Sequence, residues 1–192
     1  MRGLVVGGSI LVIVVIAALM AVRAGLDGRG AGADPQASPP GVAAPVSGDP
    51  LAIDFDAVEL DGRPFHGREL KGRVVLLDFW AVWCGPCVDA FPKLNHLADD
   101  LRYASFELVG VALYSGDHEA VGEFLEEYAI DYKVVVGEED LAFRYGVIGY
   151  PTYLLLDPDG NIYKRYVGAL PTLEERVKAD VADLTRKYGL DS

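Results

Sequence analysis

At 192 residues, with 51% hydrophobic and 24% charged residues, the chain can build one domain with a packed core, which excludes disorder throughout. The formal net charge is −12, and because the charges of residues 1–49 cancel, the excess lies in residues 50–192. A domain this acidic repels phosphate backbones, so we expect no nucleic-acid partner.

An uncharged, apolar run occupies residues 4–22, between Arg2 and Arg23. As a helix, these 19 residues span about 28 Å, close to the thickness of the hydrocarbon core of a bilayer. We therefore interpret residues 1–23 as a single membrane anchor, with a cleaved signal peptide as the alternative. Both interpretations place the folded part outside the cytoplasm, on the periplasmic or outer face of the cell membrane.

Residues 24–49 contain six glycines, four prolines and no aromatic residue. Burial of so few apolar side chains cannot offset the entropy lost on ordering, so we expect a flexible linker here. The folded domain is expected over residues 50–192.

The folded domain is expected to start with a β-hairpin over residues 55–65, after which strands alternate with helices. The expected strands cover residues 73–79, 106–113, 132–136, 152–156 and 161–167. The expected helices are one over 87–102 bent at Pro92, one capped by Asp117, a short one over 139–145 and a last one capped by Thr172 with Glu175. This order predicts an α/β fold, a central mixed sheet with helices on both faces.

Both cysteines of the chain lie in the segment Trp83-Cys84-Gly85-Pro86-Cys87. A disulfide between them closes a ring too small to restrict the unfolded chain, so redox chemistry explains the pair better than a structural role. A strand precedes the pair and a helix follows it. This order places Cys84 at a helix N-terminus, where the thiolate is favoured.

A zinc half-site is the alternative interpretation of the cysteine pair. Zinc in proteins usually takes about four ligands, and His66, His96 and His118 show no ligand spacing relative to the cysteines. We therefore expect neither a metal nor a cofactor.

The segment VLLDFWAVWCGPC at residues 75–87 matches the active-site strand and turn of the TlpA/ResA-like thiol–disulfide oxidoreductases almost residue for residue. The segment GYPT at residues 149–152 matches the family loop whose proline is cis. Residues 51–188 thus resemble this membrane-anchored family, and the resemblance implies a thioredoxin fold. Because the two motifs lie farther apart than in plain thioredoxins, it also implies the family's inserted helix and strand, within residues 114–137.

The resemblance is imperfect at two positions. TlpA-like proteins usually carry Asn at the position of Asp78, and many carry Glu at the position of Ala90. This chain is therefore expected to place its buried acid on the strand beneath the cysteines instead of on the helix behind them.

Three residues are expected to carry the chemistry. Cys84 is the candidate attacking thiol, which forms a mixed disulfide with a partner, and Cys87 then resolves it. Asp78 lies on an apolar strand, where burial would raise its pKa and let it accept the proton of Cys87. The alternative for Asp78 is a side chain that points to solvent at the end of the strand.

Three further residues are candidates for binding a substrate. If the bond before Pro151 is cis, the backbone of Tyr150 would lie beside the disulfide and pair with a substrate strand. Trp83 either offers partners an apolar surface or fills the core. Gly85 and Pro86 shape the turn, and this dipeptide resembles that of reducing thioredoxins.

The resemblance implies an extracytoplasmic, membrane-tethered enzyme that mainly reduces disulfides in exported proteins. It also implies a membrane thiol–disulfide interchange protein as the electron donor and apocytochrome c as one substrate, and residues 4–22 would contact the lipid bilayer. A disulfide-forming oxidase and a non-enzymatic copper-delivery module are the alternatives on the same fold. The copper module is expected to carry CxxxC, whereas this chain carries CxxC.

Overall fold

The computed structural model describes residues 52–102 and 104–190, which form one mixed sheet with flanking helices. The strands are β1 (Asp56–Glu59), β2 (Pro64–His66), β3 (Val74–Trp80), β4 (Phe106–Ala112), β5 (Lys133–Gly137), β6 (Thr152–Leu156) and β7 (Ile162–Val167). The helices are the 3-10 helix η1 (Gly67–Leu70), α2 (Gly85–Val88), α3 (Phe91–Asp100), α4 (His118–Leu125), α5 (Asp140–Arg144) and α6 (Leu173–Tyr188).

The predicted anchor over residues 1–23 and the predicted linker over 24–49 lie outside the described residues. Within the described ranges, none of the helices is both long and apolar enough to cross a bilayer.

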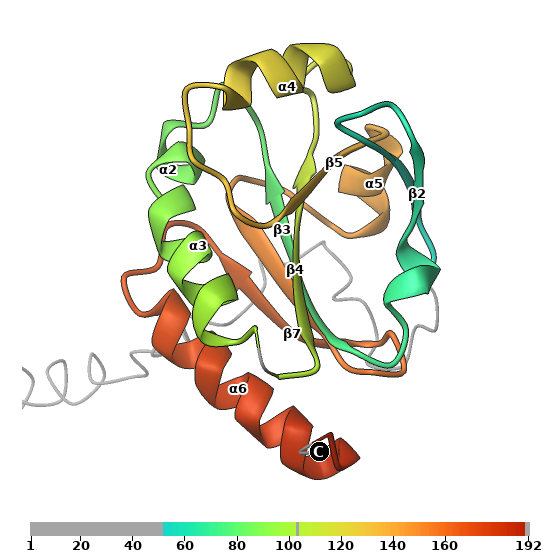
Figure 1. Cartoon of the computed structure of the whole chain (residues 1–192), viewed down its shortest axis with the longest axis vertical. Helices are drawn as coiled ribbons and strands as arrows, with labels where there is room; N and C mark the ends of the chain where they lie inside the picture. The colour runs from blue at the N-terminus through green and yellow to red at the C-terminus, as the bar shows by residue number, and fades with distance from the viewer. Residues whose placement is uncertain (1–51, 103, 191–192) are drawn as a thin grey trace, which may run out of the picture. The chain divides into compact units, whose positions relative to one another are not determined.

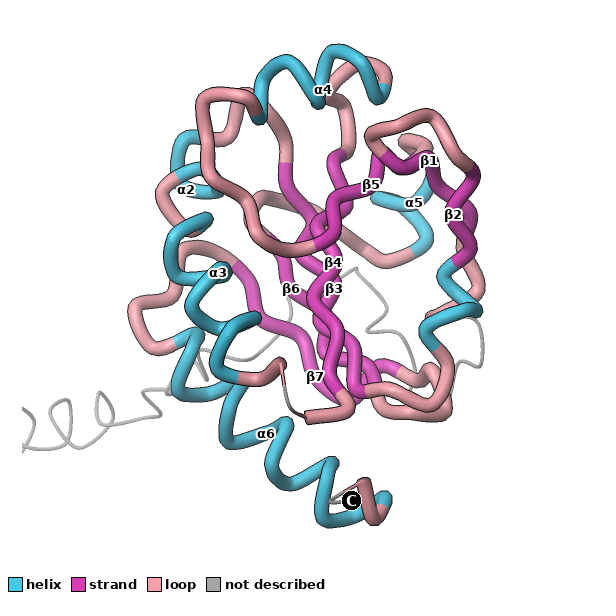
Figure 2. The backbone as a smooth tube through the Cα atoms, in the orientation of Figure 1, coloured by secondary structure: helices cyan, strands magenta, loops and turns pink. Residues whose placement is uncertain are grey.

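The seven strands are ordered β2-β1-β5-β4-β3-β6-β7 (Figure 2). The pairs β3–β4 and β4–β5 are parallel, and the outer pairs are antiparallel. The predicted hairpin over residues 55–65 is confirmed as β1–β2, and the predicted strands over 152–156 and 161–167 form a second antiparallel pair, β6–β7. Residues 114–137, where the resemblance implies an inserted helix and strand, hold α4 and β5.

Helices cover both faces of this sheet, as predicted. Every residue of β3, an interior strand between β4 and β6, is buried. Because side chains alternate along a strand, Val75, Leu77 and Phe79 pack with α5, whereas Val74 and Leu76 pack with α3 and α6. Figure 1 shows α3 and α6 on one side of the sheet and α5 on the other.

The helix after the cysteines differs from the prediction. The single bent helix over residues 87–102 is wrong, because α2 ends at Val88 and α3 begins at Phe91. Pro92 has no N–H to donate to the carbonyl of Val88, so one helical hydrogen bond is missing here, although the backbone of Asp89 and Ala90 keeps helical angles. Pro92 lies in the first turn of α3, where an N–H would have no helical partner in any case.

The two predicted helix caps have different outcomes. Asp117 caps α4 as predicted, since its Oδ1 accepts a hydrogen bond from the N–H of Ala120 at 2.9 Å. Thr172 precedes α6 but makes no side-chain cap, so the predicted capping box with Glu175 is wrong. The backbone of Thr172 has φ −100° and ψ 15°, whereas a capping residue is typically extended.

A buried polar contact fixes α6 to β7. Asp180 on α6 accepts hydrogen bonds from Lys164 Nζ at 2.8 and 3.0 Å and from the hydroxyl of Tyr166. These bonds accompany the apolar packing of α6 against the sheet.

Candidate active site

The two cysteines lie where β3 leads into α2. Cys84 is the residue before the first turn of α2 and Cys87 lies within this helix. Their sulfur atoms form a disulfide with an S–S distance of 2.05 Å. The N–H of Cys87 donates a hydrogen bond to Cys84 Sγ at 3.3 Å. α2 has only four residues, so this directed N–H, more than a long helix dipole, is positioned to favour a thiolate at Cys84.

Both cysteines are buried, but the exposed fraction of Cys84 is larger than that of Cys87. Cys84 is 5% exposed and Cys87 is 1% exposed, so Cys84 is the more accessible of the two. The neighbouring Gly85 is exposed, and no atom lies within 4 Å of the position that a Cβ would take there. Gly85 therefore leaves the approach to Cys84 open.

A groove of about 430 Å³ opens beside Cys84. Its walls include Trp83 from the CxxC turn, Tyr114 from the segment after β4, and Ile148 and Tyr150 from the segment before β6. None of the described residues that line it is charged. The groove is therefore suited to an apolar segment of a partner that brings its own sulfur to Cys84.

Trp83 forms an exposed wall of this groove. Its side chain is 63% exposed, so the core-filling alternative is wrong. Its Nε1 donates a hydrogen bond to the carbonyl of Tyr114 at 3.1 Å, and its ring meets the ring of Tyr150 edge to face at 5.4 Å. These two contacts orient the indole while leaving most of its surface available to a partner.

The sequence prediction missed the contribution of the segment after β4. The N–H of Val82 donates a hydrogen bond to Ser115 Oγ at 3.1 Å, and Ser115 Oγ donates to the carbonyl of Leu113 at 2.9 Å. With the Trp83–Tyr114 bond, these contacts fix the turn that carries the cysteines. The sequence did contain a signal for this contribution: Tyr114 and Ser115 directly follow a predicted strand. The carboxyl ends of neighbouring parallel strands meet at one edge of a sheet, where functional sites commonly form.

The bond between Tyr150 and Pro151 is cis, as the motif predicted. Thr152 begins β6, and its Oγ1 donates a hydrogen bond to the carbonyl of Gly149 at 2.7 Å. Burial raises the pKa of Tyr150 to about 12, and its buried hydroxyl has no hydrogen-bond partner among the described residues. The pairing of the Tyr150 backbone with a substrate strand stays a prediction.

Asp78 is buried on the face of β3 that α2 and α3 cover. It lies two residues before Trp80, which packs with both cysteines and Phe91. Asp78 is 1% exposed, so the alternative of a solvent-facing side chain is wrong. Burial raises its pKa to about 8, and its Oδ1 has no hydrogen-bond partner within the described residues. Near neutral pH such an acid can both accept and donate a proton.

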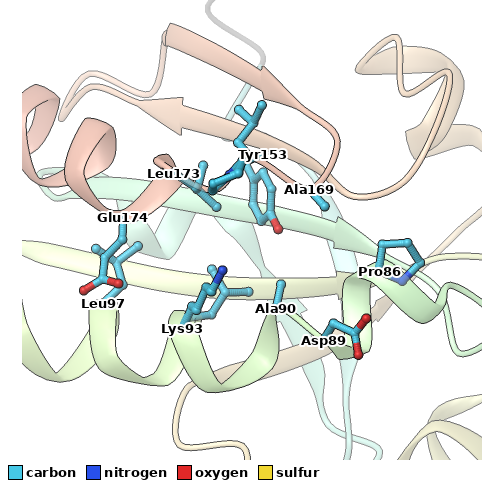
Figure 3. A pocket seen from close by; sticks show the side chains of 12 residues that line it. Pro86, Asp89, Ala90, Lys93, Leu97, Tyr153, Ala169, Leu173 and Glu174 are labelled. Carbon is cyan, nitrogen blue, oxygen red and sulfur yellow. The ribbon is translucent and has the colours of Figure 1, made fainter.

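A second cavity, of about 120 Å³, lies between α3 and the start of α6 and shares Pro86 with the groove (Figure 3). Tyr153, which pairs with Asp78 across the β3–β6 ladder, points its hydroxyl toward α3 in this cavity. The cavity contains no sulfur atom, so the larger groove is the candidate site for thiol chemistry. Over residues 52–102 and 104–190, no group of three or more His, Cys, Asp or Glu side chains could hold a metal ion.

Comparison with known proteins agrees with this geometry. The model of the Redoxin family matches residues 41–183. The thioredoxin-like protein YneN of Bacillus subtilis is 32% identical over 114 residues, which cover 58% of this chain and 66% of YneN. The thiol-disulfide oxidoreductase ResA of Bacillus subtilis is 31% identical over 103 residues, which cover 53% of this chain and 56% of ResA. This chain thus spans less than two thirds of the length of these curated relatives.

The fold is shared with solved structures of the same class. A thiol:disulfide interchange protein of the thioredoxin family from Chlorobium tepidum superposes with a TM-score of 0.58 at 26% identity, over 69% of this chain and 93% of that structure. The predicted thioredoxin-like fold and the predicted resemblance to ResA are therefore confirmed.

Proposed function

The chain belongs to the Redoxin family, and on that premise we propose that it is a thiol–disulfide oxidoreductase that mainly reduces disulfides in exported proteins. One observation carries the proposal: the Cys84–Cys87 disulfide lies at an apolar groove open to a partner, with the buried acid Asp78 on the strand that leads to it.

The first half of the reaction uses the reduced enzyme. The thiolate of Cys84 attacks one sulfur of a partner's disulfide, forms a mixed disulfide with it and displaces the partner's other sulfur as a thiolate, which takes a proton from water. The N–H of Cys87, 3.3 Å from Cys84 Sγ, favours the thiolate needed for this attack.

The second half releases the partner. Cys87 gives its proton to the carboxylate of Asp78 and attacks Cys84 Sγ, which forms the Cys84–Cys87 disulfide and displaces the partner's remaining thiolate. The partner gains two electrons and the enzyme loses two. With a pKa of about 8, roughly a tenth of Asp78 is ionised at pH 7, so this step should accelerate as the pH rises toward 8.

The location and the partners are part of this proposal. An anchor at residues 4–22 would hold the domain outside the cytoplasm, where disulfides form in exported proteins. A membrane thiol–disulfide interchange protein would return two electrons to the Cys84–Cys87 disulfide. Apocytochrome c is the exported substrate that we propose on the family resemblance, and the net charge of −12 favours a partner segment that is basic.

Reduction of insulin by the full chain in detergent micelles, with dithiothreitol as the electron source, tests the activity. We expect turnover by the wild type and none above background by Cys84→Ser. The matched variant Cys87→Ser keeps the attacking thiol but cannot resolve, so after it is reduced and freed of dithiothreitol it should accumulate a mixed disulfide with insulin. Equal turnover by the wild type and Cys84→Ser would contradict the proposal.

A redox titration of the same chain tests the direction of transfer. A reductant should have a potential near that of thioredoxin, about −270 mV, whereas an oxidant of the DsbA kind lies near −120 mV. A measured potential near −120 mV would show that the protein forms disulfides as an oxidase and does not reduce them.

A further inference from the structure

Three aromatic side chains meet in the groove beside Cys84. Trp83 and Tyr114 are 63% and 47% exposed, and the ring of Trp83 contacts that of Tyr150. The face of an aromatic ring carries partial negative charge and attracts a cation placed over it. Within residues 52–102 and 104–190, no Lys or Arg side chain lies over any of these three rings. The rings are therefore free to receive a cation from a partner.

Tyr114 holds an unusual backbone conformation in this groove. Its φ is 51°, and no other residue except glycine has a positive φ in the described part of the chain. Bulky residues rarely adopt this conformation, which costs free energy and is found most often at functional sites. The carbonyl of Tyr114 accepts a hydrogen bond from Trp83 Nε1 at 3.1 Å, and its hydroxyl donates to the carbonyl of Glu139 at 3.4 Å. Tyr114 thus connects the CxxC turn to the residue that precedes α5.

The carboxylate of Glu139 adds negative charge at this side of the groove. Burial is the main cause of the raised pKa of Tyr150, and the charges of Tyr114 and Glu139 raise it further. Glu139 is exposed and forms no ion pair with any described residue. Arg144, the basic residue of α5, donates instead to the carbonyl of Asp54 at 2.8 Å. An unneutralised carboxylate therefore lies beside aromatic walls.

We propose that the groove contains a subsite for a cation, in which an arginine or lysine beside the partner's reacting cysteine lies against Trp83, Tyr114 and Tyr150 and pairs with Glu139. This inference rests on the proposed function, in which a partner's disulfide enters the groove. The apolar stem of such a side chain suits the uncharged walls while its charged end reaches the carboxylate. Arginine suits the site best, because its planar guanidinium stacks on aromatic faces. The substrate class is thus proteins with a basic residue next to the disulfide.

Three peptides test the subsite. Each contains one intramolecular disulfide, and they differ only in the residues on both sides of the first cysteine, which are arginine, its neutral isostere citrulline or the apolar norleucine. The reduced full chain in non-ionic detergent micelles, freed of dithiothreitol, is mixed with each peptide, and the second-order rate constant of a single turnover is measured. We expect the arginine peptide to react about tenfold faster than the citrulline peptide. Equal rates for these two, or a norleucine peptide as fast as the arginine peptide, would overturn the inference.

Two variants and a control locate the effect. Glu139→Gln removes the charge but keeps the shape, so the preference for arginine over citrulline should fall to about threefold, the share of the aromatic rings. Trp83→Leu keeps an apolar wall without an aromatic face and should lower the preference by a similar factor. Glu127→Gln makes the same charge change at an exposed residue that neither lines the groove nor acts on Tyr150, and the tenfold preference should remain. An equal fall in Glu127→Gln and Glu139→Gln, or no fall in Glu139→Gln and Trp83→Leu, would refute the subsite.

Binding without thiol chemistry separates this inference from the proposed function. The same peptides with serine in place of both cysteines are titrated into the oxidised full chain, and tryptophan fluorescence follows binding. We expect the arginine form to bind about tenfold more tightly than the citrulline form. A chain that reduces none of the peptides but shows this difference would lose the proposed function and keep the subsite. A chain that reduces all three peptides at one rate would keep the function and lose the subsite.

Discussion

Replacement of Asp78 by Asn should change how the stability of the domain depends on pH. Burial raises the pKa of this carboxyl from the ordinary 3.8 to about 8. Between these values the folded chain holds a proton that the unfolded chain has released, so a rising pH favours unfolding. The stability that the protonated carboxyl provides is complete below pH 3.8 and is lost progressively up to about pH 8.

The size of the effect follows from the width of this window. Each pH unit within it lowers the free energy of unfolding by about 1.4 kcal/mol. Between pH 5 and pH 8 the wild type should therefore lose about 4 kcal/mol through Asp78 alone. Asn has no proton to release, so the stability of Asp78→Asn relative to the wild type should rise by about 4 kcal/mol over the same range.

Urea unfolding of the oxidised full chain in detergent, followed by tryptophan fluorescence from pH 5 to pH 8, measures this difference. The disulfide keeps the cysteines from titrating, and any constant cost of the substituted amide cancels when two pH values are compared. Asp89→Asn, at an exposed position on the same side of the sheet, is the control for the chemical change. Parallel curves for the wild type and Asp78→Asn would refute the argument that Asp78 is protonated in the folded chain.

In the reduced enzyme, Asp78→Asn should release a partner about a hundredfold more slowly, because Cys87 has lost its proton acceptor.

Three further substitutions separate binding from stability. Trp83→Ala should lower kcat/KM for insulin at least tenfold, because an exposed tryptophan that lines a binding groove is a typical energetic anchor. Phe143→Ala, at a 91% exposed aromatic residue that does not line the groove, should leave it unchanged, and equal effects would argue against the groove. Asp180→Ala should lower the free energy of unfolding by about 2 kcal/mol, since Lys164 and Tyr166 lose a buried acceptor, without changing the rate of insulin reduction. Unchanged urea midpoints would show that this contact contributes little.

Much of the fold follows from local patterns in the sequence. The continuous apolar run of β3 predicts a strand buried on both faces, and the Cys-Gly-Pro-Cys turn marks where the next helix begins. The break before α3 was missed although its cause was visible, because a proline in a helical pattern can bend the helix or restart it. The cap at Thr172 failed for a different reason. A side-chain cap requires an extended backbone at the capping residue. The path of the preceding loop determines this conformation, and the residue type alone does not show it.

The residues of the site also fall into those that the sequence predicted and those that it did not. Cys84, Asp78 and Trp83 were predicted because the motif carries them. Tyr114 and Ser115 were not, since their importance comes from the meeting of β3 and β4 at one edge of the sheet. Contacts between distant segments leave no periodic signal in a single sequence, so a prediction from local pattern cannot place them.

The proton chemistry of the site depends on a position outside the motif. The CxxC segment fixes Asp78 on β3, but the strand register decides that residue 110 lies beside it. A Cβ at position 110 would lie 3.2 Å from Trp80 Nε1 and from Tyr132 Cε2, closer than ordinary contact, so a lysine or arginine fits here only if both rings shift. Once paired with the Asp78 carboxylate, its charge would lower the pKa of Asp78. Glycine instead leaves the acid without a cation, and its pKa stays near 8. Two domains with identical motifs would therefore exchange protons in different pH ranges if they differ at this one residue of the neighbouring strand.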